Sequence, residues 1–382
     1  MQSRRRRIIH VMPLLDPDYG GPTEATLRLC QALHDQGVEV EVLSTDRRFL
    51  GPGPFHIDAD EWSFPITQFA TTTPIGWSRS PDLAASMRER AGEVDLVHVH
   101  TIFHHTTVVA ARAALAAGTP LVMEPHGSLT SYSRRQKLWK KRLYGQVVDH
   151  PLLRRADGVR CASSREKDDL AELGLASAAF VVPHGVEVPE PRPGPRSGAD
   201  GGPVVLFLGR LAAKKRLDLT LTAFRHTLER VPSARLRIVG SGDAASESAL
   251  HTMRDDLGIE ASVDLVGPRF GDDRARELER ADAFVLLSDD ESFGMAAAEA
   301  VCAGLPVVAT RGVASMVDLA PRAEVRLVGQ DPVEAGAALA DVLLDPEAAT
   351  RARAAAPRVV EVLSWSSIAT SMQAEYDRLI DR

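Results

Sequence analysis

Short apolar segments alternate with helical segments along almost the whole chain, and this alternation limits the fold more than any other feature. Two strands that run parallel need a crossover connection, which is usually a helix. The alternation therefore predicts an α/β protein built on parallel sheets. We expect strands over residues 8–12, 38–44, 95–100, 121–124, 158–161, 180–182, 204–208, 236–239, 263–266, 283–287 and 306–309, a first helix over 23–36 and a last one over 366–380.

The length and the proline pattern indicate two domains. A chain of 382 residues is long enough for two cores of ordinary size. Residues 188–203 are rich in Pro and Gly and are typical of a linker. We therefore expect one domain over 1–187, a second over 204–363, and a C-terminal helix over 364–382.

Composition excludes several classes of protein. The net charge of −7 and the lack of a recognisable binding module argue against nucleic acid as a partner. Cys30, Cys161 and Cys302 lie far apart without metal spacing, which favours a reduced, cytosolic setting. No apolar run approaches the roughly 20 residues that a membrane span needs. The basic residues 4–7 precede an apolar run that is too short for a signal peptide.

Two carboxylates frame the start of a predicted helix. Glu291 lies in a turn, Gly294 follows it, and Glu299 lies inside the helix. The helix N-terminus, around Phe293, Met295 and Ala296, offers unpaired amides and the positive end of the helix dipole to an anion. The two acids can then hold hydroxyl groups on either side of a phosphate, as a nucleotide-sugar site requires. The alternative is an ordinary acidic helix start, because acids favour the first turn.

Two cations follow the strand predicted over 204–208. Arg210 can form a fork of hydrogen bonds to phosphate oxygens, and Lys215 adds a mobile point charge. Ligands of open α/β sheets bind at the carboxyl ends of strands, where this loop begins. The alternative is a solvated basic loop. Near the start of the chain, Gly20 and Gly21 form a second candidate loop, or an ordinary strand-to-helix turn; the chain shows no dinucleotide-binding glycine pattern followed by an acid.

Together these residues resemble the retaining glycosyltransferases of family 4, which have the GT-B fold. The resemblance covers nearly the whole chain and rests on the E-x7-E pair, on Arg210 and Lys215, on the loop over 18–22 and on the Pro-His-Gly-Ser sequence over 125–128. It implies two Rossmann-like domains that face each other across a cleft, with the last helix returning to the first domain. It also implies that a nucleotide-diphosphate sugar is the donor.

The resemblance assigns a role to each candidate residue. Gly20 and Gly21 approach the donor diphosphate from the opposite domain, and His126 lies beside the donor sugar and the reacting bond. Glu299 holds the ribose hydroxyls, and Glu291 holds the sugar hydroxyls. The remaining assignments are Arg210, Lys215 and the amides over 293–296 for the departing diphosphate, and Val266 and Gly267 for the base.

The chemistry implied is transfer with retention, by attack on the face from which the phosphate leaves. No second carboxylate stands out for a covalent intermediate, and we expect no cofactor and no required metal. His98, His100, His104 and His105 match no common zinc spacing. Of His98 and His100, we expect one to face inward and the other outward.

The acceptor is the least constrained partner. Residues 133–145 combine six basic residues with apolar ones, which predicts either a helix for peripheral contact with an anionic membrane or lipid diphosphate, or a solvated helix whose apolar stripe packs inside. The donor base, UDP, GDP or ADP, stays open. A glycan or lipid-linked acceptor in polysaccharide synthesis is the first hypothesis. A small soluble acceptor such as an aminocyclitol is the second, and a nucleotide-sugar epimerase or an inactive scaffold are the others. The expected location is the cytoplasm, either free or on the inner face of the membrane.

Overall fold

The computed structural model describes residues 5–51, 53–72, 78–135, 143–187 and 201–382. The chain forms two compact units. One contains the residues up to Gly185 together with Trp365–Arg382, and the other contains Val186–Ser364. The first unit ends at Gly185, two residues before the expected end at 187. The second unit ends at Ser364, one residue after the expected end at 363. Most of the linker expected over 188–203 lies outside the described residues.

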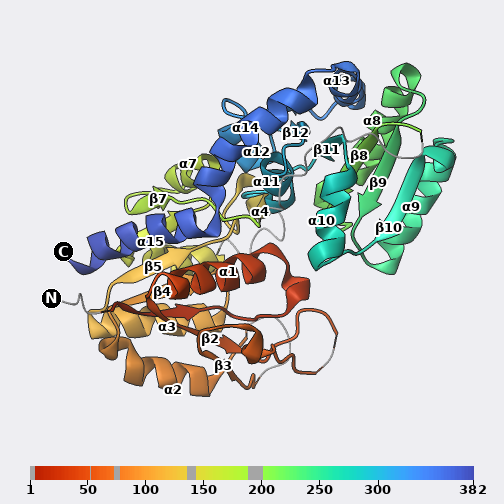
Figure 1. The fold of residues 1–382 in the computed structure, drawn as a ribbon. Helices are drawn as coiled ribbons and strands as arrows, with labels where there is room; N and C mark the ends of the chain where they lie inside the picture. Colours follow the sequence, from red (N-terminus) through yellow and green to blue (C-terminus); the bar gives the residue numbers. More distant parts are fainter. Residues whose placement is uncertain (1–4, 52, 73–77, 136–142, 188–200) are drawn as a thin grey trace. The chain divides into compact units, whose positions relative to one another are not determined.

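The first unit is built on a parallel sheet of seven strands in the order β3-β2-β1-β4-β5-β6-β7 (Figure 1). The chain winds outward from β1 in one direction and from β4 in the other. The loops after β1 and β4 therefore diverge at the centre of the carboxyl edge, the usual position of a ligand site in such sheets. The strands are β1 (Arg7–Val11), β2 (Glu39–Thr45), β3 (Ile66–Phe69), β4 (Leu96–His100), β5 (Leu121–Glu124), β6 (Gly158–Cys161) and β7 (Ala179–Val181).

Helices cover both faces of this sheet. One face packs against α1 (Gly21–Asp35) and the C-terminal helix α15 (Trp365–Ile380). The other face packs against α2, α3, α6 and α7. These four helices span Pro81–Arg90, His105–Ala117, His150–Arg155 and Ser164–Glu172, and the short α4 spans Ser131–Arg135.

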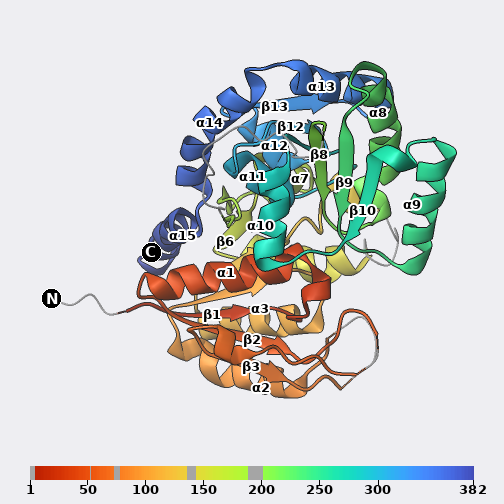
Figure 2. The same ribbon diagram turned by 45° about the vertical axis from the view of Figure 1, so that its right-hand side comes forward.

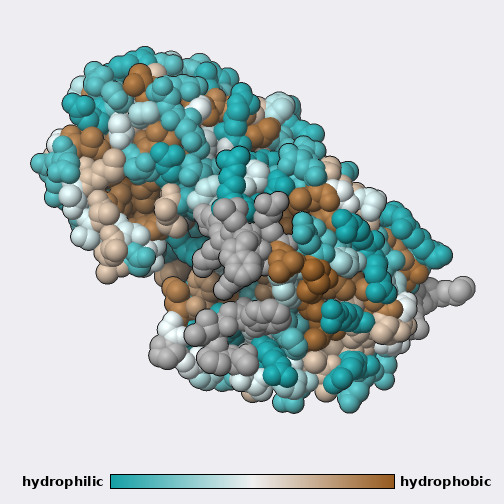
Figure 3. Space-filling view, turned by 180° about the vertical axis from the view of Figure 1, so that it is seen from behind, coloured by the Kyte–Doolittle hydropathy of each residue, from teal (hydrophilic) through white to brown (hydrophobic). Residues whose placement is uncertain are grey.

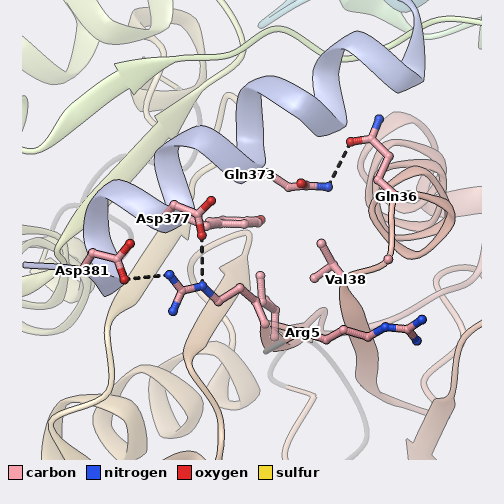
Figure 4. A pocket seen from close by; sticks show the side chains of 10 residues that line it. Arg5, Gln36, Val38, Gln373, Asp377 and Asp381 are labelled. Carbon is pink, nitrogen blue, oxygen red and sulfur yellow. Dashed lines mark hydrogen bonds and ion pairs between the residues drawn. The ribbon is translucent and has the colours of Figure 1, made fainter. Parts of the chain in front are cut away.

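The C-terminal helix belongs to the first unit. Its apolar side inserts Ile368, Met372 and Tyr376 into the core beside α1, and Figure 2 shows the two helices next to each other. Its polar side is joined to the start of the chain by Asp377 and Asp381, which both accept hydrogen bonds from Arg6 (Figure 4). The residues after Ser364 therefore form part of the helical layer on one face of this sheet.

The second unit is a parallel sheet of six strands in the order β10-β9-β8-β11-β12-β13. The direction of winding reverses between β8 and β11, which are hydrogen-bonded neighbours. The strands are β8 (Val204–Leu208), β9 (Arg235–Val239), β10 (Val263–Gly267), β11 (Ala283–Leu286), β12 (Val307–Thr310) and β13 (Val325–Val328). The helices are α8 (Leu217–Arg230), α9 (Ala244–Asp256), α10 (Gly271–Arg280), α11 (Met295–Cys302), α12 (Ala314–Leu319), α13 (Pro332–Leu344) and α14 (Ala348–Leu363).

The strand predictions are confirmed, with ends that shift by one residue at most of the strands. Two further strands, β3 and β13, escaped prediction. Both lie at the edge of a sheet and are only partly buried, so their sequences lack the continuous apolar run that marks the central strands.

No helix within the described ranges is both long enough and apolar enough to cross a bilayer. The face shown in Figure 3 is mainly hydrophilic, with apolar residues in small groups. The helix predicted over 133–145 can be followed only in part. Residues 136–142 lie outside the described ranges, and Arg134, which is described, pairs with Glu172 of α7 at 2.7 Å.

Candidate functional site

The candidate site of the second unit is built from loops at the carboxyl edge of its sheet. The loops after β8 and β9 are in direct contact, since the amide of Leu211 donates to the carbonyl of Ser241 at 2.8 Å. Gly240 makes this contact possible. A Cβ atom at that position would lie 1.9 Å from the carbonyl oxygen of Gly209. The stretch around Gly240 is a loop that leads into α9.

An ion pair joins the loop after β8 to the loop after β11. The ammonium of Lys215 lies 2.8 Å from Oε1 of Glu291, and that of Lys214 lies 3.7 Å from the same oxygen. The side chains of Lys215 and Glu291 are 13% and 11% exposed, while that of Lys214 is 35% exposed. Because β8 and β11 are neighbours at the point where the winding reverses, the fold itself places this pair there.

The charge of Glu291 is stabilised by these lysines. Burial acts to raise its pKa, but the charges of Lys215 and Lys214 outweigh burial and hold the pKa below its ordinary value. Glu291 is therefore ionised at neutral pH. A buried carboxylate with a cation beside it can accept hydroxyl hydrogens on one side and leave the cation facing an anion.

The backbone around α11 is fixed by glycines and by a neighbouring loop. Gly294 has a φ of 91°, and a Cβ there would lie 2.5 Å from Val313. The segment before it pairs with the loop after β12, since Glu291 donates to the carbonyl of Gly312 and Ser315 donates to that of Phe293. Within α11 the first amides that bond inside the helix are those of Ala297 and Ala298.

The amides at the start of α11 are those of Met295 and Ala296, which begin the helix. The first turn of a helix has no internal acceptor for such donors, and the dipole favours negative charge beside them. The structure thus puts the start of α11 directly after the loop that carries Glu291. An anion held there would lie close to the Lys215–Glu291 pair.

Glu299 is buried in α11 and has a partner that sequence analysis missed. Nη2 of Arg274, from α10, lies 2.5 Å from its Oε2. Arg274 carries no signal in the sequence, because α10 is highly charged throughout and its arginines look alike. The acid predicted to hold ribose hydroxyls is therefore held in place by a cation from the neighbouring helix.

The other predicted residues of this unit lie along the same edge. Arg210 is exposed in the loop directly after β8. Val266 and Gly267 are the last two residues of β10, so the strand extends one residue further than predicted. They lie two strands away from β8 in the sheet order. Their role in holding the base stays a prediction.

In the first unit, Gly20 and Gly21 begin α1 at the reversal point of the sheet. Gly20 has a φ of 89°, a backbone conformation that favours glycine. Nothing lies within 4 Å of a Cβ built on Gly21, so its backbone faces open space. Asp16 holds the loop by accepting hydrogen bonds from the amides of Asp18 and Phe49.

His126 occupies a strained turn after β5. It and Gly127 have φ values of 50° and 72°, and the amide of Ser128 donates to the carbonyl of Pro125. Glu166 supports the turn by accepting from the amide of Gly127 at 2.6 Å. A left-handed residue other than glycine is costly and is often found at functional sites. The imidazole itself is only 3% exposed.

The ring of His126 turns toward a buried group of polar side chains. Its Nε2 lies 3.1 Å from Nδ1 of His100 and 3.6 Å from Oε2 of Glu124. Glu124 is paired with Arg160, whose Nη1 lies 3.0 Å from Oε2. The sequence does carry a signal for this pair. Glu124 and Arg160 are charged residues of opposite sign in two buried strands, β5 and β6, that follow each other along the chain.

The expectation for His98 and His100 was wrong. Residues two apart in a strand share a face, and both imidazoles are fully buried on the same side of β4. His10 of β1 joins them, and one ring nitrogen from each of the three histidines lies within 4.8 Å of the other two. In the structure, His10 and His100 are joined by a hydrogen bond of 2.9 Å. The expectation of no required metal stays a prediction.

Comparison with known proteins identifies two matching families. The family described as Glycosyl transferase 4-like domain matches residues 20–185. The family described as Glycosyl transferases group 1 matches residues 195–359. The two matches divide the chain as its two structural units do.

Curated relatives and solved structures agree with these families. The chain is 28% identical over 345 residues to a GDP-mannose:cellobiosyl-diphosphopolyprenol alpha-mannosyltransferase of Xanthomonas oryzae, covering 87% of the chain and 85% of the relative. It is also 28% identical to a D-inositol 3-phosphate glycosyltransferase of Mycobacterium marinum, covering 97% and 84%. Among solved structures, Anabaena HepE in complex with UDP and glucose aligns with a TM-score of 0.79 at 20% identity, covering 98% of this chain and all of the other.

The structural similarity confirms the fold, with two parallel α/β domains of seven and six strands. The family matches confirm the resemblance that the glutamate pair and the basic loop indicated. The chain therefore belongs to the glycosyltransferases of family 4, of the group 1 type, and has the GT-B fold.

Proposed function

We propose that this protein transfers a hexosyl group, with retention of configuration, from a nucleotide-diphosphate sugar to a hydroxyl group. The observation that carries the proposal is the Lys215–Glu291 pair, which lies where the winding of the second sheet reverses and next to the start of α11. In this proposal Lys215, Arg210 and the first amides of α11 stabilise the departing diphosphate. Glu291 holds the sugar hydroxyls, and Glu299 holds the ribose.

The acceptor we favour is a glycan or a lipid-linked sugar. The Xanthomonas relative is named for a cellobiosyl-diphosphopolyprenol acceptor, whereas the mycobacterial relative is named for inositol phosphate. A small soluble acceptor is therefore the second candidate. The two relatives are equally similar to this chain in sequence, each at 28% identity. A nucleotide-sugar epimerase and an inactive scaffold are less well supported, because every polar residue of the motif is present.

The remaining parts of the proposal concern cofactors, location and membrane contact. We propose that no metal or other cofactor is required, since cations and helix amides are available to the diphosphate. A cytoplasmic location is supported by three cysteines that are all free. Peripheral contact through residues 133–145 stays a hypothesis. Nucleic acid is not among the proposed partners.

The proposal is tested by an assay of transfer. Purified protein is incubated with UDP-, GDP- or ADP-sugars and either a polyprenyl-diphosphate-linked disaccharide or inositol phosphate. We expect one donor to be consumed only when a suitable acceptor is present, and the anomeric coupling in the NMR spectrum of the product to match that of the donor. An inverted product would refute retention. Conversion of a donor into its epimer in the absence of an acceptor would refute the proposed transferase activity.

A further inference from the structure

Imidazole and charged side chains occupy two neighbouring rows across the first sheet, close to the carboxyl ends of its strands. The register places His10 of β1 opposite His98 of β4 in one row, and His100 of β4 opposite Glu124 of β5 in the next. Continued into β6, the second row reaches Arg160. All five side chains are buried. Their proximity is thus set by strand register rather than by a loop.

One carboxylate oxygen of Glu124 lies close to the polar atoms of several of these side chains. Its Oε2 lies 3.0 Å from Nη1 of Arg160, 3.2 Å from Nδ1 of His100 and 3.5 Å from Nε2 of His98. Burial acts to raise the pKa of Glu124, but the Arg160 guanidinium and the nearby imidazoles hold it well below the ordinary value. An ionised carboxylate can only accept hydrogen bonds. The ring nitrogen of His100 that faces it therefore carries a proton.

That proton fixes the roles of the neighbouring rings. With Nδ1 protonated, a neutral His100 has a bare Nε2, which accepts from Nδ1 of His10 at 2.9 Å. The Nδ1–H of His100 also faces Nε2 of His126 at 3.1 Å, so Nε2 of His126 is a hydrogen-bond acceptor too. Burial lowers the pKa of His126 to about 4, which keeps the ring neutral. Its own proton then lies on Nδ1.

A second branch ends at the C-terminal helix and does not reach His126. The hydroxyl of Tyr376 lies 2.7 Å from Nδ1 of His98 and donates to it, because the other nitrogen of His98 faces the carboxylate. Other titratable groups near these side chains are His184, which stacks on the ring of His126, Cys30 of α1, Cys161 of β6 and Glu166 of α7. The carboxylate of Glu166 accepts hydrogen bonds from the amides of Gly127 and Ala162.

We propose that Glu124, held by Arg160, is a positioning residue that fixes His126 as a neutral ring with its proton on Nδ1. The part of this inference that concerns catalysis rests on the proposed function and on the family resemblance, which implies that His126 lies beside the donor sugar. A ring whose Nε2 is engaged by His100 presents a hydrogen-bond donor and does not take up a proton. His126 then orients the donor sugar without acting as a general base.

The direct test is the tautomer of His126 in the full chain. Two-bond ¹⁵N–¹H NMR spectra of ¹⁵N-histidine-labelled protein, with His126→Gln used for assignment, report which ring nitrogen is protonated. We expect His126 of the wild type to be neutral and protonated on Nδ1 at pH 7. In Glu124→Gln the amide can donate as well as accept, and we expect that single form to be lost. A wild-type His126 that is charged, or protonated on Nε2, would overturn the proposal, as would an unchanged tautomer in Glu124→Gln.

Tyr376→Phe is the matched control, because it removes a buried hydroxyl from the same network without touching Glu124, His100 or His126. We expect it to leave the tautomer of His126 unchanged, and a change there would contradict the assignment of the branches. If Glu124→Gln does not fold, His100→Gln removes the shared ring proton instead and should have the same effect on His126. Zinc found between His10 and His100 would also overturn the assignment, since both would then lose their mutual hydrogen bond.

Activity provides a second readout. With a donor found by the transfer assay, Glu124→Gln should lower kcat about ten- to a hundredfold, by analogy with removal of the partner that orients a metal-bound histidine. It should leave the KM for the donor unchanged. An unchanged kcat would show that the tautomer does not matter for transfer. If the wild type transfers no sugar at all, the proposed function fails, whereas the NMR result still decides the role of Glu124.

Discussion

At the scale of single residues, Lys215 and Lys214 show how position separates two identical side chains. Both approach Oε1 of Glu291, but Lys215 does so at 2.8 Å with little exposure, whereas Lys214 lies at 3.7 Å and is about a third exposed. An ion pair that is shielded from water is stronger than one at the surface. Of the two lysines, Lys215 is therefore the one that should stabilise the departing diphosphate.

Replacing each lysine in turn tests this difference. Lys215→Ala should lower kcat by about a hundred- to a thousandfold, the usual effect of removing one preorganised group that stabilises developing charge. Lys214→Ala is the matched control and should change kcat far less. The rates come from the transfer assay, with circular dichroism to show that both variants fold. Equal losses in the two variants would remove the special role of Lys215.

The sequence predicted Glu291 and Glu299 from their short, characteristic spacing, and Lys215 from its place in the loop after the strand over 204–208. It did not predict Arg274 or the histidine network, because these contacts depend on which helices and strands become neighbours. His10 lies 90 residues from His100 along the chain and is joined to it only by the sheet. Residue types indicated the chemistry, and register decided the partners.

At the scale of elements, the helix α15 completes the first unit. Its Tyr376 donates to His98 in a fully buried contact, so the helix contributes a polar anchor as well as apolar area. The sequence predicted a last helix over 366–380, and the family resemblance implied its return to the first domain. The tyrosine's partner could not be predicted, because it lies 278 residues away in β4.

Tyr376→Phe should destabilise the first unit by about 1–3 kcal/mol, because Nδ1 of His98 would lose its donor while it stays buried. All four tryptophans of the chain lie in the first unit, so tryptophan fluorescence during urea unfolding reports on this unit alone. Ser371→Ala, on the exposed side of the same helix, is the control and should change stability by less than about 0.5 kcal/mol. Equal effects would mean that the hydroxyl adds nothing.

The buried histidines should make the first unit sensitive to acid. Burial lowers the pKa of His10, His98, His100, His126 and His184. When a histidine is neutral in the folded state but takes up a proton in the unfolded state, the folded protein loses stability as the pH falls below the ordinary histidine pKa of about 6.5. Each such proton corresponds to about 1.4 kcal/mol per pH unit.

Glu166 and Asp149, both buried, act in the opposite direction. Burial raises the pKa of Glu166 and of Asp149 to about 7, so these groups hold protons in the folded state and add stability as pH falls. Five histidines outweigh two acids, and the melting temperature of the first unit should fall between pH 7 and pH 5. Tryptophan fluorescence during heating measures it. His98→Gln should make the dependence shallower, and the exposed His251→Gln should not; a melting temperature that rises toward pH 5 would contradict the account.

At the scale of the whole molecule, the chain leaves the first unit after Gly185 and re-enters it at Trp365. The two passages run side by side, since Val186 donates to the carbonyl of Leu363 and forms a parallel bridge with Ser364. The sequence predicted a division near these positions from its proline-rich stretch and its final helix. It could not show that Gly185 packs directly against the ring of Trp365.

Gly185→Ala tests the importance of that packing. The added Cβ would lie 2.4 Å from the indole, which must shift, and such overpacking typically costs about 1–3 kcal/mol. Gly92→Ala is the control, because its Cβ would meet only Ala117, at 3.8 Å. Unfolding followed by tryptophan fluorescence should separate the two variants. If Gly185→Ala is as stable as the wild type, the passage tolerates a side chain.

The central claim is that the second unit binds a nucleotide-diphosphate sugar through Lys215, Glu291 and Glu299. Calorimetric titration of the full chain with UDP, GDP and ADP, and then with their sugar conjugates, tests it most directly. The account predicts that one diphosphate binds at micromolar strength and that Glu299→Gln weakens it about tenfold or more, as loss of a hydrogen bond to a charged group should. The exposed Glu260→Gln should bind like the wild type. Binding of none of the three diphosphates, or equal binding by Glu299→Gln, would contradict the account.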